Sequence, residues 1–317
     1  MTNKMSRGVS MQILINHSAF NDQAKELVIL GINTIIEQLP ELNLVSLDSI
    51  IVPHDYGIEL AAFQENITAT IGYTNSGLGI GVGKTLAYLE NDMFKTTIFL
   101  DPRLVAGIID DSGRQSHTHI IHHELCHVHD DNEKYRVFGV CDIDDLFIHT
   151  DDMVKQLMYT HADNLWSEYI ATKLSAGSRP DDHHFYVKSL FAALSVTLPE
   201  IQDEITKFKT HSDIRELFGH LQLKISYLLK ITGYFLGYCN AIVGSIPPEF
   251  SEEIQSNYPY FEVPIVQLQT HLKLMEETYG SWVDSSIFER LAEGVLLLWE
   301  NLGIRLYNNE GQLYVDV

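Results

Sequence analysis

The chain has 317 residues, 45% of them hydrophobic, so it is long enough to bury a substantial core as one large domain or two of ordinary size. It carries 43 acidic and 21 basic residues, a formal net charge of −22. A field of that sign repels phosphate backbones and anionic lipid surfaces, so nucleic acids and membranes are poor expected partners, although acidity also simply aids solubility.

Three features bear on the compartment. Residues 1–12 contain two basic residues but no apolar run of signal-peptide length, which predicts a protein that is not exported. The most apolar stretch, residues 223–244, is interrupted by two lysines and is expected to be a buried helix rather than a membrane span. The cysteines are odd in number and widely spaced, which fits a reducing compartment such as the cytoplasm. They are Cys126, Cys141 and Cys239.

The first hundred residues mix strand-like and helix-like segments. Residues 22–38 carry apolar side chains at helical spacing, with Asn21 or Asp22 available as the N-cap. Residues 95–100 form the clearest β-rich run. Further strands are expected over residues 11–16, 44–52 and 68–73. An α+β layer is therefore expected in this part of the chain.

Glycines at positions 77, 79, 81 and 83, followed by Lys84-Thr85, suggest a phosphate-binding loop. That loop requires a glycine five positions before Gly83, and this position is Leu78, so the spacing is wrong. A glycine at every second residue predicts instead an extended segment with one bare face, or a hairpin arm that follows residues 75–77.

From residue 151 onward nearly all segments carry apolar residues at the three-and-four spacing of helices. The tail differs, because residues 304–307 and 312–317 flank a turn-rich tetrapeptide and predict a terminal hairpin. The turn-rich segment 175–182 is the expected domain boundary. The expected helices span residues 151–176, 184–196, 214–233, 263–279 and 287–303.

Residues 116–130 are rich in histidine and contain one in-register His-Glu-x-x-His pattern, formed by His123, Glu124 and His127. On a helix, side chains at i and i+4 lie on one face, so the two imidazoles can converge on one Zn²⁺ at ~2.0–2.1 Å. Glu124 then projects beside the metal, where it can accept a proton from the water that zinc activates. The alternative is a His-rich amphipathic helix without a metal.

A catalytic zinc needs a third protein ligand besides two histidines. One arrangement continues the helix with a glycine and a third histidine, but the corresponding positions here are Asp130 and Glu133. The other takes a glutamate from a following helix, and Glu168 is the only acidic residue of the run 164–172. No lysine or arginine among its helix neighbours pairs with Glu168, so an exposed surface glutamate is the less favoured alternative. Fallback ligands are His161, Asp163 and, more weakly, Glu133.

Both motifs resemble those of the gluzincin clan of zinc metallopeptidases, in which a His-Glu-x-x-His helix precedes a helix with a glutamate ligand. Within the clan the sequence is most similar to the ImmA/IrrE-like regulatory peptidases, whose motifs read His-Glu-Leu-Gly-His and approximately Glu-x-x-Ala-Asn-x-Phe-Ala. The resemblance covers residues 116–176, with Cys126 in place of the glycine, and no DNA-binding helix-turn-helix is evident. In the second motif Glu168 and Ala171 match the family pattern. The other three positions depart from it and are Thr172, Leu174 and Ser175.

The resemblance implies zinc on His123, His127 and Glu168, with Glu124 as the general base and then as the proton shuttle to the leaving amine. These are the four residues that the spacing also favours. Hydrolysis further requires a donor that stabilises the oxyanion. Several residues are of a suitable type, and the sequence does not select among Tyr159, Tyr169, His161, His183 and His184.

Other residues of the motif helix have structural expectations. Ser116 or Thr118 is expected to cap it. Cys126 is expected to face the core as a small apolar group rather than to act as a nucleophile, because both flanking histidines are already used. Residues 129–131 either orient the ligands or end the helix.

The predicted fold is α+β. A zincin-like metallopeptidase domain with a small sheet spans residues 1–176, and a mostly helical domain spans residues 183–317. The leading function is zinc-dependent hydrolysis of peptide bonds in a cytoplasmic protein or peptide. A regulatory or sensor protein that keeps Zn²⁺ with little turnover and a metal-free helical interaction protein stay open as alternatives.

Overall fold

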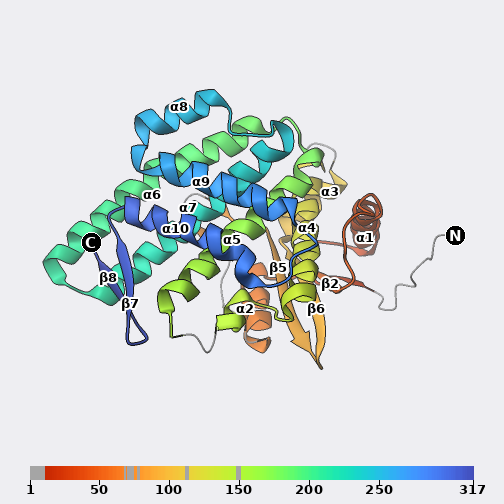
Figure 1. Ribbon diagram of the computed structural model, residues 1–317. Helices are drawn as coiled ribbons and strands as arrows, with labels where there is room; N and C mark the ends of the chain where they lie inside the picture. Colours follow the sequence, from red (N-terminus) through yellow and green to blue (C-terminus); the bar gives the residue numbers. More distant parts are fainter. Residues whose placement is uncertain (1–10, 68, 70–74, 77–78, 111–113, 148–150) are drawn as a thin grey trace. The chain divides into compact units, whose positions relative to one another are not determined.

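The computed structural model describes residues 11–67, 69, 75–76, 79–110, 114–147 and 151–317. The chain forms two compact units, Met1–Cys141 and Asp142–Val317. The fold is α+β, as predicted: the first unit holds a small mixed sheet with helices, and the second is mostly helical with a terminal hairpin (Figure 1).

The sheet of the first unit has the strand order β1-β2-β6-β5, in which β1, β2 and β6 are parallel and β5 is antiparallel. β5 therefore lies at the edge and forms a hairpin with β6, whose turn residues Asn91 and Asp92 have φ values of 51° and 62°. The strands are β1 (Gln12–Ile15), β2 (Leu47–Val52), β5 (Gly83–Glu90) and β6 (Met93–Leu100). A separate antiparallel pair is formed by β3 (Asn75–Ser76) and β4 (Gly79–Ile80), which agrees with one of the two expectations for this segment, a hairpin arm after residues 75–77.

Helices cover both faces of this sheet. Consecutive side chains of a strand point to opposite faces. Leu86 of β5 packs with Phe99 and Leu60 in a buried cluster beneath α2, whereas the preceding Thr85 contacts α4. Helices α1 and α3 contact α4 and each other on that second face (Figure 1). The helices are α1 (Asp22–Glu37), α2 (Tyr56–Asn66), α3 (Pro102–Ile109) and α4 (Arg114–Phe138).

Side-chain caps explain where three of these helices begin. Asn21, Asp55 and Asp101 cap α1, α2 and α3 with side-chain oxygens 2.9, 3.0 and 2.8 Å from backbone nitrogens of the first turn. The cap on α1 was predicted. Helices α2 and α3 were not, although Asp101 followed by Pro102 is a helix-start signal as well as a strand end.

The second unit is built around α5 (Met153–Ser175) and α7 (Ile214–Ile242). Glycines let these two helices approach closely: a Cβ at Gly237 would lie 2.3 Å from the backbone oxygen of Tyr169, and one at Gly233 2.8 Å from that of Leu165. Each glycine is therefore required because a side chain at its position would collide with α5, and not because its backbone conformation favours glycine. The stretch 223–244 was predicted to be a buried helix, and most of it lies in α7 with one face buried.

The other elements of the second unit pack around this pair. Helix α6 contacts α7, and α10 contacts both α5 and α9. The terminal hairpin is confirmed, with Glu310 and Gly311 in the turn at φ of 51° and 75°. The elements are η1 (Ile143–Phe147), η2 (Ala176–Ser178), α6 (His183–His211), α8 (Pro248–Asn257), α9 (Pro259–Glu277), η3 (Ser285–Phe288), α10 (Glu289–Asn301), β7 (Arg305–Asn309) and β8 (Gln312–Asp316).

Several boundaries differ from those expected. Helix α4 already includes Arg114, so Ser116 and Thr118 lie inside it and do not cap it. It continues to Phe138, past the residues 129–131 that were considered as its end. The expected strand over 68–73 falls almost entirely outside the described residues. By contacts the chain divides at Cys141/Asp142, whereas the predicted boundary, 175–182, lies within the second unit.

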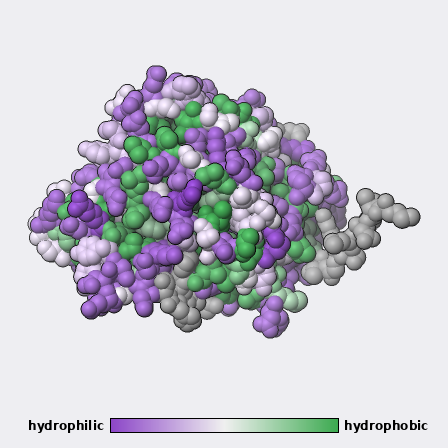
Figure 2. Space-filling view, in the orientation of Figure 1, coloured by the Kyte–Doolittle hydropathy of each residue, from purple (hydrophilic) through white to green (hydrophobic). Residues whose placement is uncertain are grey.

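Of the helices in the described ranges, none combines the length and apolar character needed to cross a membrane. Figure 2 shows hydrophilic residues over much of the face drawn, with hydrophobic residues interleaved among them. This mixture agrees with an ordinary charged fraction of 20% over the whole chain.

Candidate metal centre

The two motif histidines lie on α4 in the register that a shared metal requires. Their Nε2 atoms are 3.0 Å apart, and the two rings meet edge to face with an interplanar angle of 87°. Two nitrogens at this separation can both lie ~2.0–2.1 Å from one zinc ion. His123 and His127 are each half-buried, so they retain access to solvent. The two imidazole nitrogens are therefore suitable ligands for one transition-metal ion.

Glu124 lies on the same helix but turns toward the sheet. Its side chain is buried, and its Oε2 accepts a hydrogen bond of 2.8 Å from the Thr85 hydroxyl on β5. Gly83, two residues earlier on β5, lies beside Oε1. The sequence did not identify these two contacts, although the expected bare face of the glycine-rich segment was a signal that something packs closely there.

Glu168 lies on α5 in the second unit and is half-buried. Its Oε1 forms an ion pair of 2.8 Å with the Nζ of Lys230 on α7. The expectation that no basic residue among the helix neighbours pairs with Glu168 therefore holds along α5, but it did not consider partners on other helices, and α7 supplies one. Burial alone would lower the pKa of Lys230, but the carboxylate of Glu168 raises it overall. Lys230 therefore stays charged.

Residues further along α4 have structural partners. The Nδ1 of His129 accepts a hydrogen bond of 2.8 Å from the backbone N–H of Asn43, and burial lowers its pKa, which suits an uncharged acceptor. Glu133 accepts two hydrogen bonds from Arg136 at 3.0 and 2.9 Å. Both residues thus serve local packing, and Glu133 is a poor fallback ligand.

Cys126, between the two histidines, is fully buried. Burial raises the pKa of its thiol well above the usual value, so a thiolate nucleophile is disfavoured. The structure thus supports the expectation of a small apolar group.

The candidate oxyanion donors all belong to the second unit. Tyr169 donates its hydroxyl hydrogen bond to Glu276 at 2.8 Å. Burial raises the pKa of Tyr159 to about 12. The ring of His183 lies against Tyr238 and Phe250, with centroids 6.2 and 5.1 Å away. These contacts are structural ones and do not single out a donor.

His161, a fallback ligand, lies in the core of the second unit at 1% exposure. Its ring is near Trp299, with centroids 5.8 Å apart, and its Nδ1 is 3.3 Å from the Ser226 hydroxyl. Burial lowers its pKa to about 4 from the ordinary value of 6.5. The folded protein therefore holds this histidine neutral at pH values where the unfolded chain protonates it.

That difference predicts acid sensitivity of the second unit. As the pH falls below 6.5, His161 becomes protonated in the unfolded state but stays neutral in the folded state. The free energy of unfolding therefore declines until the pH reaches about 4, where the folded state also binds the proton. His161 should account for a loss of about 2 kcal/mol between pH 7 and pH 5. This loss can be measured by denaturant unfolding at each pH, with tryptophan fluorescence as the signal, because all three tryptophans lie in this unit. His161→Leu should lose correspondingly less, and an unchanged pH dependence would contradict the assignment.

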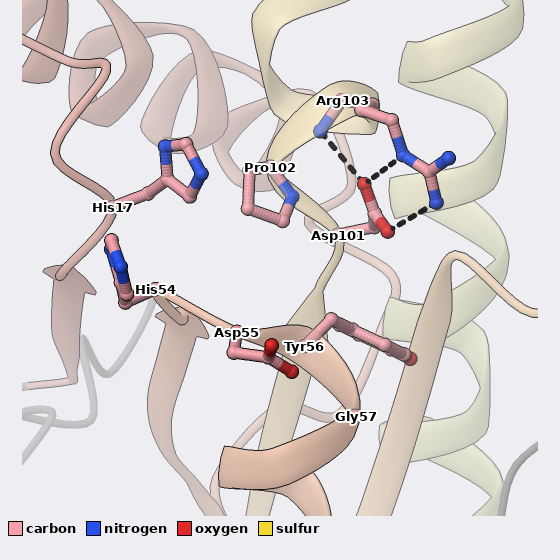
Figure 3. Close-up of a pocket in the computed structure, with 8 residues that line it drawn as sticks. All are labelled: His17, His54, Asp55, Tyr56, Gly57, Asp101, Pro102 and Arg103. Carbon is pink, nitrogen blue, oxygen red and sulfur yellow. Dashed lines mark hydrogen bonds and ion pairs between the residues drawn. The ribbon is translucent and has the colours of Figure 1, made fainter.

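A second feature of the first unit is a polar pocket of about 310 Å³ at the C-terminal ends of the parallel strands (Figure 3). Small ligands often bind at such an edge. His17 and His54 line one side, with ring centroids 5.5 Å apart. On the other side Arg103 holds Asp101 at 2.9 and 2.8 Å and lowers the pKa of that carboxyl. The two carboxylates of the lining, Asp55 and Asp101, also cap α2 and α3, so both already have hydrogen-bond donors.

Comparison with known proteins found no matching family model, curated protein or solved structure. The functional assignment therefore rests on the residues themselves.

Proposed function

We propose that this protein is a zinc-dependent peptidase in which His123, His127 and Glu168 hold the metal and Glu124 is the general base. The observation that carries the proposal is the 3.0 Å approach of the two histidine Nε2 atoms on the helix that also bears a buried glutamate. His123, His127 and Glu168 each offer one ligand atom and are each partly buried. Three such ligands with an open position are typical of catalytic zinc.

Each residue has a distinct part in this chemistry. Zinc, when bound, supplies Lewis-acid activation of water and of the peptide carbonyl. Glu124 is rotated about 100° from His123 around the helix axis, so its carboxylate serves the attacking water rather than the metal. It takes a proton from the water as the water oxygen forms a bond to the carbonyl carbon of the peptide, and it passes that proton to the amide nitrogen as the C–N bond breaks. The products are the amine of one fragment and the carboxylic acid of the other, which keeps the water oxygen.

Lys230 fits the proposed ligand role of Glu168. Carboxylates that ligate metals are themselves hydrogen-bonded, and such partners fix their orientation. The 2.8 Å ion pair supplies this partner from α7. The gluzincin and ImmA/IrrE-like resemblance, a zincin-like arrangement of sheet, motif helix and glutamate helix, and a cytoplasmic protein or peptide substrate are parts of the same proposal.

Metal removal tests the proposal. Wild-type protein should hydrolyse members of a fluorescence-quenched peptide library, lose this activity when a chelator removes zinc, and regain it when zinc is returned. His127→Ala should not regain it at the same zinc concentration, because one ligand is missing. Hydrolysis that persists in the chelator would contradict a zinc mechanism.

A further inference from the structure

The edge strand β5 presents Thr85 directly to the glutamate of the motif. The Thr85 hydroxyl has one proton and two acceptors in reach, the Glu124 carboxylate at 2.8 Å and the Glu124 backbone oxygen at 3.1 Å. The shorter contact goes to a charged acceptor, which makes it the stronger of the two. Thr85 is half-buried and Glu124 is buried, so water competes weakly for this bond.

Gly83 contacts the same carboxylate from the same face of β5, because residues i and i+2 of a strand share a face. A Cβ at Gly83 would lie 2.6 Å from Oε1, 2.8 Å from Cγ and 2.9 Å from Cδ of Glu124. A larger residue at this position would force the outer part of the Glu124 side chain to shift. Gly83 pairs with Leu100 in the regular ladder of β5 and β6, so the requirement is for space and not for an unusual backbone conformation.

The two residues act on the carboxylate in different ways. Thr85 holds Oε2 by a hydrogen bond, and Gly83 keeps the space in which Oε1 lies. A free glutamate side chain samples several rotamers, whereas proton transfer requires a heavy-atom distance of roughly 2.6–3.2 Å. A restraint from the sheet would therefore keep the base in its working orientation.

We propose that Thr85 is a positioning residue for Glu124 and that Gly83 provides the space for this arrangement. The inference rests on the proposed function, in which Glu124 is the general base. A purely structural alternative is that Thr85 only ties the edge strand to α4, for which its contact with the Glu124 backbone oxygen would suffice. The two hypotheses differ in whether the Glu124 carboxylate changes its position when the Thr85 hydroxyl is removed.

The first test compares Thr85→Val, which keeps the shape and removes the hydroxyl, with Thr85→Ser, which keeps the hydroxyl. Hydrolysis of the quenched peptide library by Thr85→Val should fall roughly ten-fold in kcat with KM little changed, and Thr85→Ser should stay near wild type. Thr97→Val is the matched control, because Thr97 on β6 hydrogen-bonds Ser49 at 3.0 Å, away from Glu124. It should lose stability and keep kcat.

The second test does not depend on activity. In protein labelled with ¹³C-glutamate, the carboxyl resonance of Glu124 is identified by its loss in Glu124→Gln. It should shift in Thr85→Val and in Gly83→Ala, and stay in place in Thr85→Ser. An unshifted resonance in Thr85→Val would overturn the inference, as would an equal loss of kcat in Thr85→Ser.

A double substitution separates this inference from the proposed function. In the Glu124→Gln background, Thr85→Val should cause no further loss of hydrolysis, because the base is already gone. If Glu124→Gln hydrolyses peptides like wild type, the general-base role fails, and the carboxyl resonance alone then tests the positioning. If Glu124→Gln is inactive while Thr85→Val keeps wild-type kcat, the positioning role fails and the proposed function stands.

Discussion

Glu124→Gln should retain zinc at nearly wild-type occupancy and lose hydrolytic activity by roughly 10²-fold or more. The amide keeps the size of the side chain and can still accept the Thr85 hydrogen bond, but it cannot take a proton from water. Because Glu124 turns toward β5 and the histidine nitrogens converge on each other, its loss should leave the metal ligands in place. Zinc content and peptide hydrolysis, measured on the same preparation, test this separation.

Glu133→Gln is the matched control for this change. It makes the same chemical substitution on the same helix, at a carboxylate whose partners are Arg136 and Asn43. It should keep both zinc and activity. Loss of zinc in Glu124→Gln would instead make Glu124 a ligand, and unimpaired hydrolysis would assign the base elsewhere.

Glu168→Gln should weaken zinc binding by roughly 10- to 100-fold while the protein stays folded, since a neutral amide is a poor zinc ligand. Competition with a chelator of known affinity measures the change. His123 and His127 would then hold the metal alone, and two ligands are one short of a catalytic site.

Two controls isolate the ligand role of Glu168. The substitution also breaks the ion pair with Lys230, and Lys230→Met breaks that pair while leaving the carboxylate in place. It should keep zinc far better than Glu168→Gln does. Asp163→Asn tests the fallback ligand on the same helix. If Asp163→Asn loses zinc and Glu168→Gln does not, the gluzincin assignment is wrong.

Much of the architecture followed from local patterns. The periodic apolar residues of α5 and α10, the Asn21 cap of α1 and the terminal hairpin are all properties of short stretches of chain, and the structure confirms them. Helix α2 was missed because it has only 11 residues, against 23 in α5, so its apolar pattern is too short to stand out. Helix α8 was missed because it buries little more than Ile254.

Contacts between distant segments could not be predicted in the same way. Lys230 and Glu168 are 62 positions apart in the sequence, and the pattern of neither helix alone predicts that they pair. Likewise the restraint of Glu124 by Thr85 depends on β5 lying at the sheet edge beside α4. The motif identified the chemical groups, whereas their partners depended on tertiary packing.

The central claim, a zinc site on this chain, is tested most directly by the metal content of the wild-type protein purified without a polyhistidine tag. Native mass spectrometry should show about one zinc ion per chain, and elemental analysis should identify the metal as zinc. A metal-free protein that takes up no added zinc would contradict the claim and would leave the motif as a His-rich helix without a metal.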